Sequence, residues 1–209
     1  MLIAAAVLMV LFGSIYFFWK EGGSRKPLIF KAVATLMAVL LAFYHAVNSE
    51  AADLWWLFFG ILFYMAADVL LEIWFLSGVT AFGIGHICVI VSLLGTGAAA
   101  WNTVLIFLIL YGGMFLVVRK YLKDLGKLLL PGFFYAALLC LMAALAISRG
   151  IKVQNLASVL TGIGGICFVV SDTILGWSHL SGNRRRGYSA LLLILYYTAV
   201  YLLAAGRMM

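Results

Sequence analysis

The segment NLASVLTGIGGICFVVSDTILGW, residues 155–177, decides how this chain folds. It holds 23 residues, and Asp172 is its only charged side chain. A helix needs about 20 predominantly apolar residues to cross the hydrocarbon core of a bilayer. The segment is therefore predicted to be a membrane-spanning helix that carries a carboxyl group inside the membrane.

The composition extends this interpretation to the whole chain. Of its 209 residues, 67% are hydrophobic and 10% are charged, whereas a soluble domain carries about 25% charged residues. This excludes a soluble globular enzyme, a disordered chain and a disulfide-rich secreted module. The three cysteines lie in apolar runs without CxxC spacing and are interpreted as buried packing residues.

Apolar runs bounded by charged residues, Gly or Pro predict one all-α domain, residues 1–209, with eight transmembrane helices. The predicted spans are residues 2–19, 27–47, 54–76, 79–98, 101–118, 129–148, 155–177 and 188–206. The first run has no basic segment before it and no clear cleavage site. We interpret it as a retained span and not as a signal peptide.

Basic residues gather on one side of the predicted bundle. Ten of the 14 Lys and Arg residues fall in the connections after the first, fifth and seventh spans: Lys20, Arg25, Lys26, Arg119, Lys120, Lys123, Lys127, Arg184, Arg185 and Arg186. Arg149, Lys152 and Arg207 lie on the other side, and Lys31 lies within a span. The positive-inside rule makes the ten cytoplasmic, so both termini are predicted on the non-cytoplasmic side. The net charge of +7 then reflects topology and anionic headgroups, and no nucleic-acid partner is expected.

An internal repeat has a period of 104 residues. Six residues recur at this distance: Gly60, Asp68, Leu71, Leu76, Ser77 and Gly78 have as counterparts Gly164, Asp172, Leu175, Leu180, Ser181 and Gly182. The only two prolines, Pro27 and Pro131, have the same separation. This predicts a parallel duplication of four spans, with halves of about 1–104 and 105–209. Asp68 and Asp172 then occupy equivalent places in the two halves.

Ionisable side chains within the spans are the candidate site, because such groups are costly in lipid and rarely lack a function. On the predicted topology they share the cytoplasmic half of the bilayer: Lys31, Asp68, Glu72, His86 and Asp172. Tyr196 and Tyr197 lie midway along the last span. Simpler readings stay open for several of them. Glu72 can be a solvated interface residue, Lys31 can reach the headgroups, and the histidine and tyrosines can be packing residues.

Two carboxyl groups in one pocket of low dielectric constant share a proton, which supplies a general acid and a general base together. The same pair can serve as a proton relay in a transporter, and residue chemistry leaves both classes open. A zinc hydrolase is not favoured, because the predicted topology puts His45 near the non-cytoplasmic side of the membrane and His179 at the cytoplasmic side, and because no HExxH motif occurs. Neither aspartate belongs to a GxGD motif, and there is no GxSG motif. This excludes the intramembrane aspartyl and rhomboid-type proteases.

Several motifs resemble those of the YhhN-like membrane proteins, a family that includes lysoplasmalogenases. Residues 165–175, GICFVVSDTIL, resemble the family stretch G-x-x-F-x-x-S-D-x-x-L, which contains Ser171 and Asp172. Four further matches are Asp68 with Leu71, Phe82 with His86, Lys31 in the second span, and residues 196–199, YYTA. Four positions depart from the family pattern: Ala32, Ala67, Val89 and Val200.

The resemblance implies hydrolysis of the vinyl ether bond of lysoplasmalogens, giving a fatty aldehyde and a glycerophospho-alcohol. One of Asp68 and Asp172 would be the acid and the other would orient water. Lys31 would hold the substrate phosphate, and His86 and Tyr197 would position water or the glycerol hydroxyl.

No metal or organic cofactor is implied, and the expected partners are a lysophospholipid and membrane lipids. A proton-coupled transporter of small molecules or lipids and a lipid-binding protein without turnover are the alternatives. The short connections and the lack of a targeting extension favour a bacterial plasma membrane. The headgroup preference and the oligomeric state are not indicated.

Overall fold

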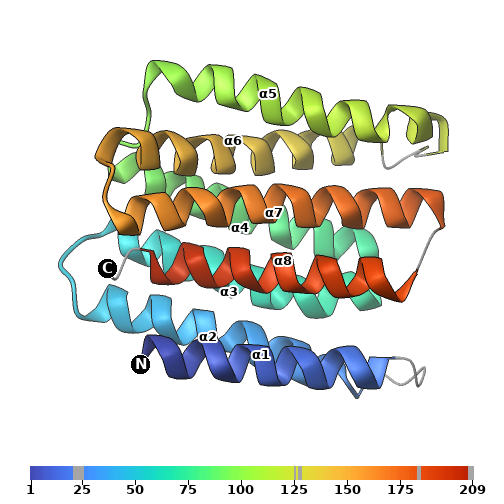
Figure 1. Cartoon of the computed structure of the whole chain (residues 1–209), viewed down its shortest axis with the longest axis horizontal. Coiled ribbons are helices and arrows are strands. Elements are labelled where there is room, and N and C mark those ends of the chain that lie inside the picture. The colour runs from blue at the N-terminus through green and yellow to red at the C-terminus, as the bar shows by residue number, and fades with distance from the viewer. Residues whose placement is uncertain (21–25, 125, 127–128, 183–184, 207–209) are drawn as a thin grey trace.

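The computed structural model describes residues 1–20, 26–124, 126, 129–182 and 185–206. Within these residues, eight helices are long and apolar enough to cross a membrane, which confirms the predicted all-α fold with eight spans. The protein is an integral multi-pass membrane protein. Its helices run side by side, and both ends of the chain lie at the same end of the bundle (Figure 1).

The long helices have these bounds: α1 Leu2–Trp19, α2 Leu28–Val47, α3 Asp53–Ile73, α4 Phe75–Gly95, α5 Trp101–Val118, α6 Leu129–Val153, α7 Leu156–Ser181 and α8 Arg186–Ala205. A short 3₁₀ helix, η2 Arg119–Asp124, continues α5. Helix α7 is clearly delimited at both ends. The Asn155 side chain accepts a hydrogen bond from the Ser158 amide at the start of α7, and Gly182 ends α7 with a φ of 65°.

The boundary between the third and fourth spans differs from the sequence prediction, which placed a break at residues 77–78. The chain instead breaks at Trp74, whose backbone is extended, and α4 begins at Phe75. Gly78 lies inside α4, where a Cβ atom would stand 2.4 Å from the Leu71 Cα atom. This glycine therefore serves close packing of α3 against α4, and Leu76 belongs to α4.

The helices differ strongly in how much of their surface the bundle covers. In the membrane-spanning stretch of α4, 61% of the residues are buried inside the bundle. In the span formed by α5 and the start of η2, the buried share is 6%. Figure 1 shows α5 at one edge of the bundle and α1 at the opposite edge. The buried ionisable residues Lys31, Asp68, His86 and Asp172 lie on α2, α3, α4 and α7. Helix α5 contributes one buried residue, Thr103, and otherwise closes one side of the bundle with a mainly apolar surface.

Helix packing follows a pattern that the predicted duplication would produce. Within each half the consecutive helices pack together, and the halves meet through α4 against α6 and through α2 against α8. The duplication itself and the side on which the termini lie stay predictions. Arg25, Lys127, Arg184 and Arg207, used in the orientation count, and the side chain of Lys123 lie outside the described residues. We use "basic end" for the end of the bundle where α1 connects to α2 and α7 connects to α8.

Candidate active site

Asp68 is the centre of a buried polar cluster between α2, α3 and α8. Its side chain is 2% exposed. Its Oδ2 atom accepts hydrogen bonds from the Thr35 hydroxyl and, at 2.9 Å, from the Tyr196 hydroxyl. The Nζ atom of Lys31, which is also buried, lies 3.7 Å from Oδ1. Two hydroxyl donors and one cation thus converge on this carboxylate, the environment that a buried negative charge requires.

Glu72 lies one turn after Asp68 and belongs to the same cluster. Its Oε1 atom accepts a 2.7 Å hydrogen bond from the Tyr16 hydroxyl and lies 3.4 Å from Lys31 Nζ. Lys20 approaches the same oxygen to 3.8 Å. The Lys31 ammonium therefore bridges two carboxylates. Its predicted role as the phosphate ligand stays a prediction, and in this structure its charge is directed at Asp68 and Glu72.

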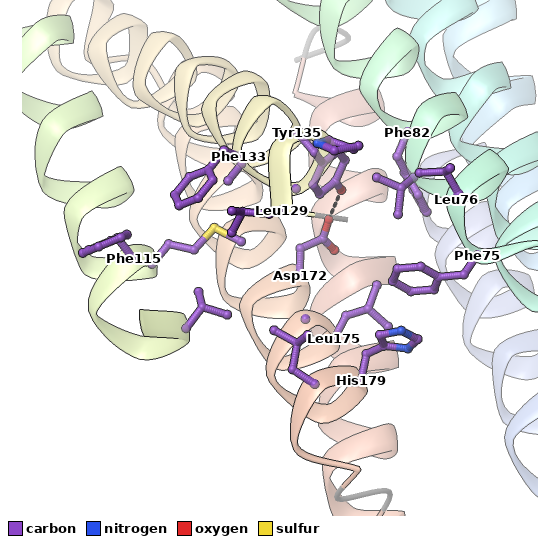
Figure 2. Close-up of a pocket in the computed structure, with 18 of the residues that line it drawn as sticks. Phe75, Leu76, Phe82, Phe115, Leu129, Phe133, Tyr135, Asp172, Leu175 and His179 are labelled. Carbon is purple, nitrogen blue, oxygen red and sulfur yellow. Dashed lines mark hydrogen bonds between the residues drawn. The ribbon is translucent and has the colours of Figure 1, made fainter. Parts of the chain in front are cut away.

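Asp172 belongs to a second hydrogen-bonded chain, which runs from α7 through α6 and α4 to α3. Its Oδ2 atom accepts a hydrogen bond from the Tyr135 hydroxyl, as Figure 2 shows. The Tyr135 oxygen lies 3.4 Å from His86 Nε2, and His86 Nδ1 lies 2.7 Å from the Tyr64 hydroxyl. Because Tyr135 gives its proton to Asp172, it can only accept from His86. His86 then carries its proton on Nε2 and accepts from Tyr64 through Nδ1.

An aromatic cluster separates the two centres. The ring of Phe168 contacts the rings of Tyr64, His86, Phe82 and Tyr196, with centroid separations of 5.0, 4.9, 6.1 and 5.6 Å. The two aspartates therefore have different hydrogen-bond partners. The structure thus places the two aspartates in two hydrogen-bonded centres with aromatic rings between them. The prediction that the two carboxyl groups act as a pair stays a prediction.

A cavity of about 130 Å³ opens beside Asp172, between α4, α5, α6 and α7. Its lining is mainly apolar and includes Phe75, Phe82 and Leu175 (Figure 2). Four lining side chains are polar: Tyr111, Tyr135, Asp172 and His179. The cavity thus places a carboxyl group against a space that suits an alkyl chain, the usual composition of a ligand pocket.

Two of the predicted site residues lie outside these hydrogen-bonded centres. The Ser171 hydroxyl donates to the Leu192 carbonyl at 3.2 Å, which joins α7 to α8. The Tyr197 ring packs on Gly13, and its buried hydroxyl has no hydrogen-bond partner among the described residues. Among those residues, no group of three His, Cys, Asp or Glu side chains is placed to hold a metal ion.

Four residues of the two centres were not predicted from the sequence, namely Tyr16, Thr35, Tyr64 and Tyr135. For all of them except Tyr16 the sequence holds a signal. Thr35 lies four residues after Lys31, and Tyr64 lies four residues before Asp68, so each shares a helix face with its charged neighbour. Tyr135 lies 104 residues after Lys31, which is the period that relates the two aspartates.

Comparison with known proteins gives one match. The sequence model described as the YhhN family matches residues 26–207, which is most of the chain and includes α2 to α8. No curated protein and no solved structure matches the chain.

Proposed function

Since the chain belongs to the YhhN family, we propose that it hydrolyses the vinyl ether bond of lysoplasmalogens. The products are a fatty aldehyde and a glycerophospho-alcohol. One observation carries this proposal: Asp172 lines an apolar cavity and is hydrogen-bonded, through Tyr135, to the buried His86. A carboxylic acid in an apolar cavity is suited to protonating an uncharged lipid double bond.

Asp172 is the general acid in this proposal. Tyr135 holds its Oδ2 atom, so the acidic proton resides on Oδ1. Transfer of that proton to the β-carbon of the vinyl ether uses the electron pair of the double bond. It leaves an oxocarbenium ion opposite the new carboxylate, which stabilises the positive charge.

Water then adds to the carbon bonded to the ether oxygen and releases one proton. Asp172 or Asp68 takes this proton. The hemiacetal that has formed then breaks its bond to the glycerol oxygen, which leaves with a proton from that carboxyl group, and the hemiacetal hydroxyl gives its proton back to the carboxylate as the aldehyde forms. Lys31, Thr35 and Tyr196 converge on Asp68 and support its role as the ionised carboxylate of the pair. No step of this reaction needs an oxidant, and water is the only second substrate.

Aldehyde release by purified protein in detergent tests the proposal, with an alkenyl-lysophospholipid as substrate. Hydrolysis needs no closed compartment, whereas transport does, so turnover in micelles separates the enzyme from the transporter alternative. We expect activity in the wild type, and its loss in Asp68→Asn and in Asp172→Asn. Asp53→Asn, at the other end of α3, is the matched control and should keep activity.

Two results would refute the proposal. Full activity in either of the first two variants would remove that aspartate from the mechanism. A folded wild-type protein that releases no aldehyde would favour the proton-coupled transporter, which uses the same carboxylates.

A further inference from the structure

Helix α1 lies at one edge of the bundle, yet it contributes a side chain to the Asp68 centre (Figure 1). It precedes residues 26–207, which the family model matches. Its largest buried side chain is that of Tyr16, which is 1% exposed. The mechanism proposed above uses no residue of α1, so Tyr16 is a buried polar group without an assigned role.

The Tyr16 hydroxyl holds the Glu72 carboxylate in an inward position. It donates to Oε1 of Glu72 at 2.7 Å, the length of a charge-assisted O–H···O⁻ bond. The Glu72 side chain is 33% exposed, so water at the basic end competes for it. A hydroxyl on a buried ring has little freedom to move, whereas a partly exposed glutamate has several rotamers. Tyr16 therefore selects the rotamer that turns Glu72 toward α1 and α2.

The position of Glu72 in turn affects where the Lys31 ammonium lies. Lys31 Nζ is 3.4 Å from Glu72 Oε1 and 3.7 Å from Asp68 Oδ1. The same ammonium lies over the Tyr16 ring, 5.6 Å from its centroid, inside the range of about 6 Å for a cation–π contact. Two attractions from the side of α1 thus act against the attraction of Asp68. Without the inward Glu72 carboxylate, the ammonium would lose the nearer of its two partners.

We propose that Tyr16 is a positioning residue of the Asp68 centre. Its hydroxyl fixes Glu72, and Glu72 keeps the Lys31 ammonium shared between two carboxylates. Catalytic groups need to be held within about 0.5 Å of the productive geometry, which requires supporting residues that are themselves fixed. The effect on catalysis rests on the proposed function, whereas the link between Tyr16 and Glu72 is measurable without hydrolysis.

Tyr16→Phe tests this role because it removes the hydroxyl and keeps the ring below the ammonium group. We expect kcat for aldehyde release to fall about 10-fold, the lower end of the range for a hydrogen bond to a charged group. KM should stay within about twofold, since the described lining of the Asp172 cavity includes no residue of α1.

Tyr201→Phe is the matched control. The Tyr201 hydroxyl also ties α1 to the rest of the bundle, but it donates to the Leu2 carbonyl oxygen, at 3.2 Å, and not to a carboxylate. Its removal should leave kcat and KM within about twofold of the wild type. The comparison separates the positioning of Glu72 from the anchoring of α1.

Glu72→Gln completes the design. Gln keeps the size of the side chain and can still accept the Tyr16 hydrogen bond, but it has no charge to hold Lys31. In this background Tyr16→Phe should change kcat by less than about twofold, because the hydroxyl then has no charged group to position. In reversible unfolding, Tyr16→Phe should shift the equilibrium constant about 10-fold to 100-fold in the wild type and about fivefold in the Glu72→Gln variant.

The assignment is overturned if Tyr16→Phe keeps the wild-type kcat, or if its loss of kcat is undiminished in the Glu72→Gln background. Equal losses in Tyr16→Phe and Tyr201→Phe would also overturn it, because they would show that the hydroxyl only anchors α1. If the folded wild type releases no aldehyde, the proposed hydrolysis fails and unfolding alone decides. Equal shifts of the unfolding equilibrium in the two backgrounds would then refute the link between Tyr16 and the Glu72 charge.

Discussion

Replacing Lys31 by Met tests the charge cluster that surrounds Asp68. Met keeps an apolar stem of similar length and removes the ammonium group, which lies 3.7 Å from Asp68 and 3.4 Å from Glu72. Removing one partner of a buried ion pair costs about 3–5 kcal/mol, because the other charge stays buried without compensation. Glu72 is 33% exposed and keeps Lys20 nearby, so the cost falls on Asp68.

The expected loss for Lys31→Met is about 3 kcal/mol of unfolding free energy, at the lower end of that range, because two hydroxyl donors still hold Asp68. Asp68→Asn should cost less, about 1–2 kcal/mol, since Lys31 then keeps Glu72 as its partner. In the double variant neither member of the pair remains. Its loss should therefore fall short of the sum of the single losses by about 1–2 kcal/mol.

Reversible unfolding in mixed maltoside and dodecyl sulfate micelles measures these four free energies. Lys120→Met removes an exposed lysine at the same end of the bundle and should change the stability by less than about 0.5 kcal/mol. If the double variant is additive within about 0.5 kcal/mol, the two groups are not coupled and the ion pair does not organise this centre.

Three further substitutions address the second centre and its cavity. Tyr135→Phe removes the hydrogen-bond donor to Asp172, the proposed general acid. It should slow aldehyde release about 10-fold to 100-fold with little change in melting temperature, and an unchanged rate would exclude this hydrogen bond from the mechanism. Gly85→Ala places a Cβ atom 2.6 Å from the Tyr64 ring and should lower the melting temperature by about 3 °C or more. The control Gly112→Ala has nothing within 4 Å of its Cβ atom and should not lower it. Equal melting temperatures of the two variants would contradict the close packing of Gly85 against Tyr64. Gly176→Leu adds a side chain in open space at the cavity wall and should raise KM about 10-fold while the melting temperature holds; an unchanged KM would show that the substrate chain lies elsewhere.

The spans and the charged members of the site were predictable because lipid imposes strong rules on sequence. Eight apolar runs of sufficient length predicted eight helices, and Asp68 and Asp172 stood out as carboxyl groups within such runs. The hydroxyl partners were not predicted. Tyr and Thr are common in apolar helices, and the residue type alone does not show whether a side chain donates a hydrogen bond or only packs.

Which residues meet across helices depends on close approaches that hydropathy does not reveal. Gly60 of α3 lies so near α4 that an added Cβ atom would stand 2.6 Å from a Val89 methyl group and 3.0 Å from the Gly85 carbonyl oxygen. Contacts of this kind fix the rotation of α3 relative to α4 and so bring Tyr64 to His86. The break at Trp74 was missed for a related reason, since Gly78 was read as a chain break and is a packing residue.

The two halves differ at a residue that contacts each aspartate. Lys31 and Tyr135 are 104 residues apart, and each lies one turn after one of the two prolines. Lys31 gives Asp68 a cation, whereas Tyr135 gives Asp172 only a hydrogen bond. Different surroundings give two carboxyl groups different tendencies to ionise, which suits a division of the pair into an acid and a base. Under the predicted duplication, divergence at this position contributes to the difference between Asp68, which is held by a cation, and Asp172, the cavity-lining residue that we propose as the proton donor to the lipid.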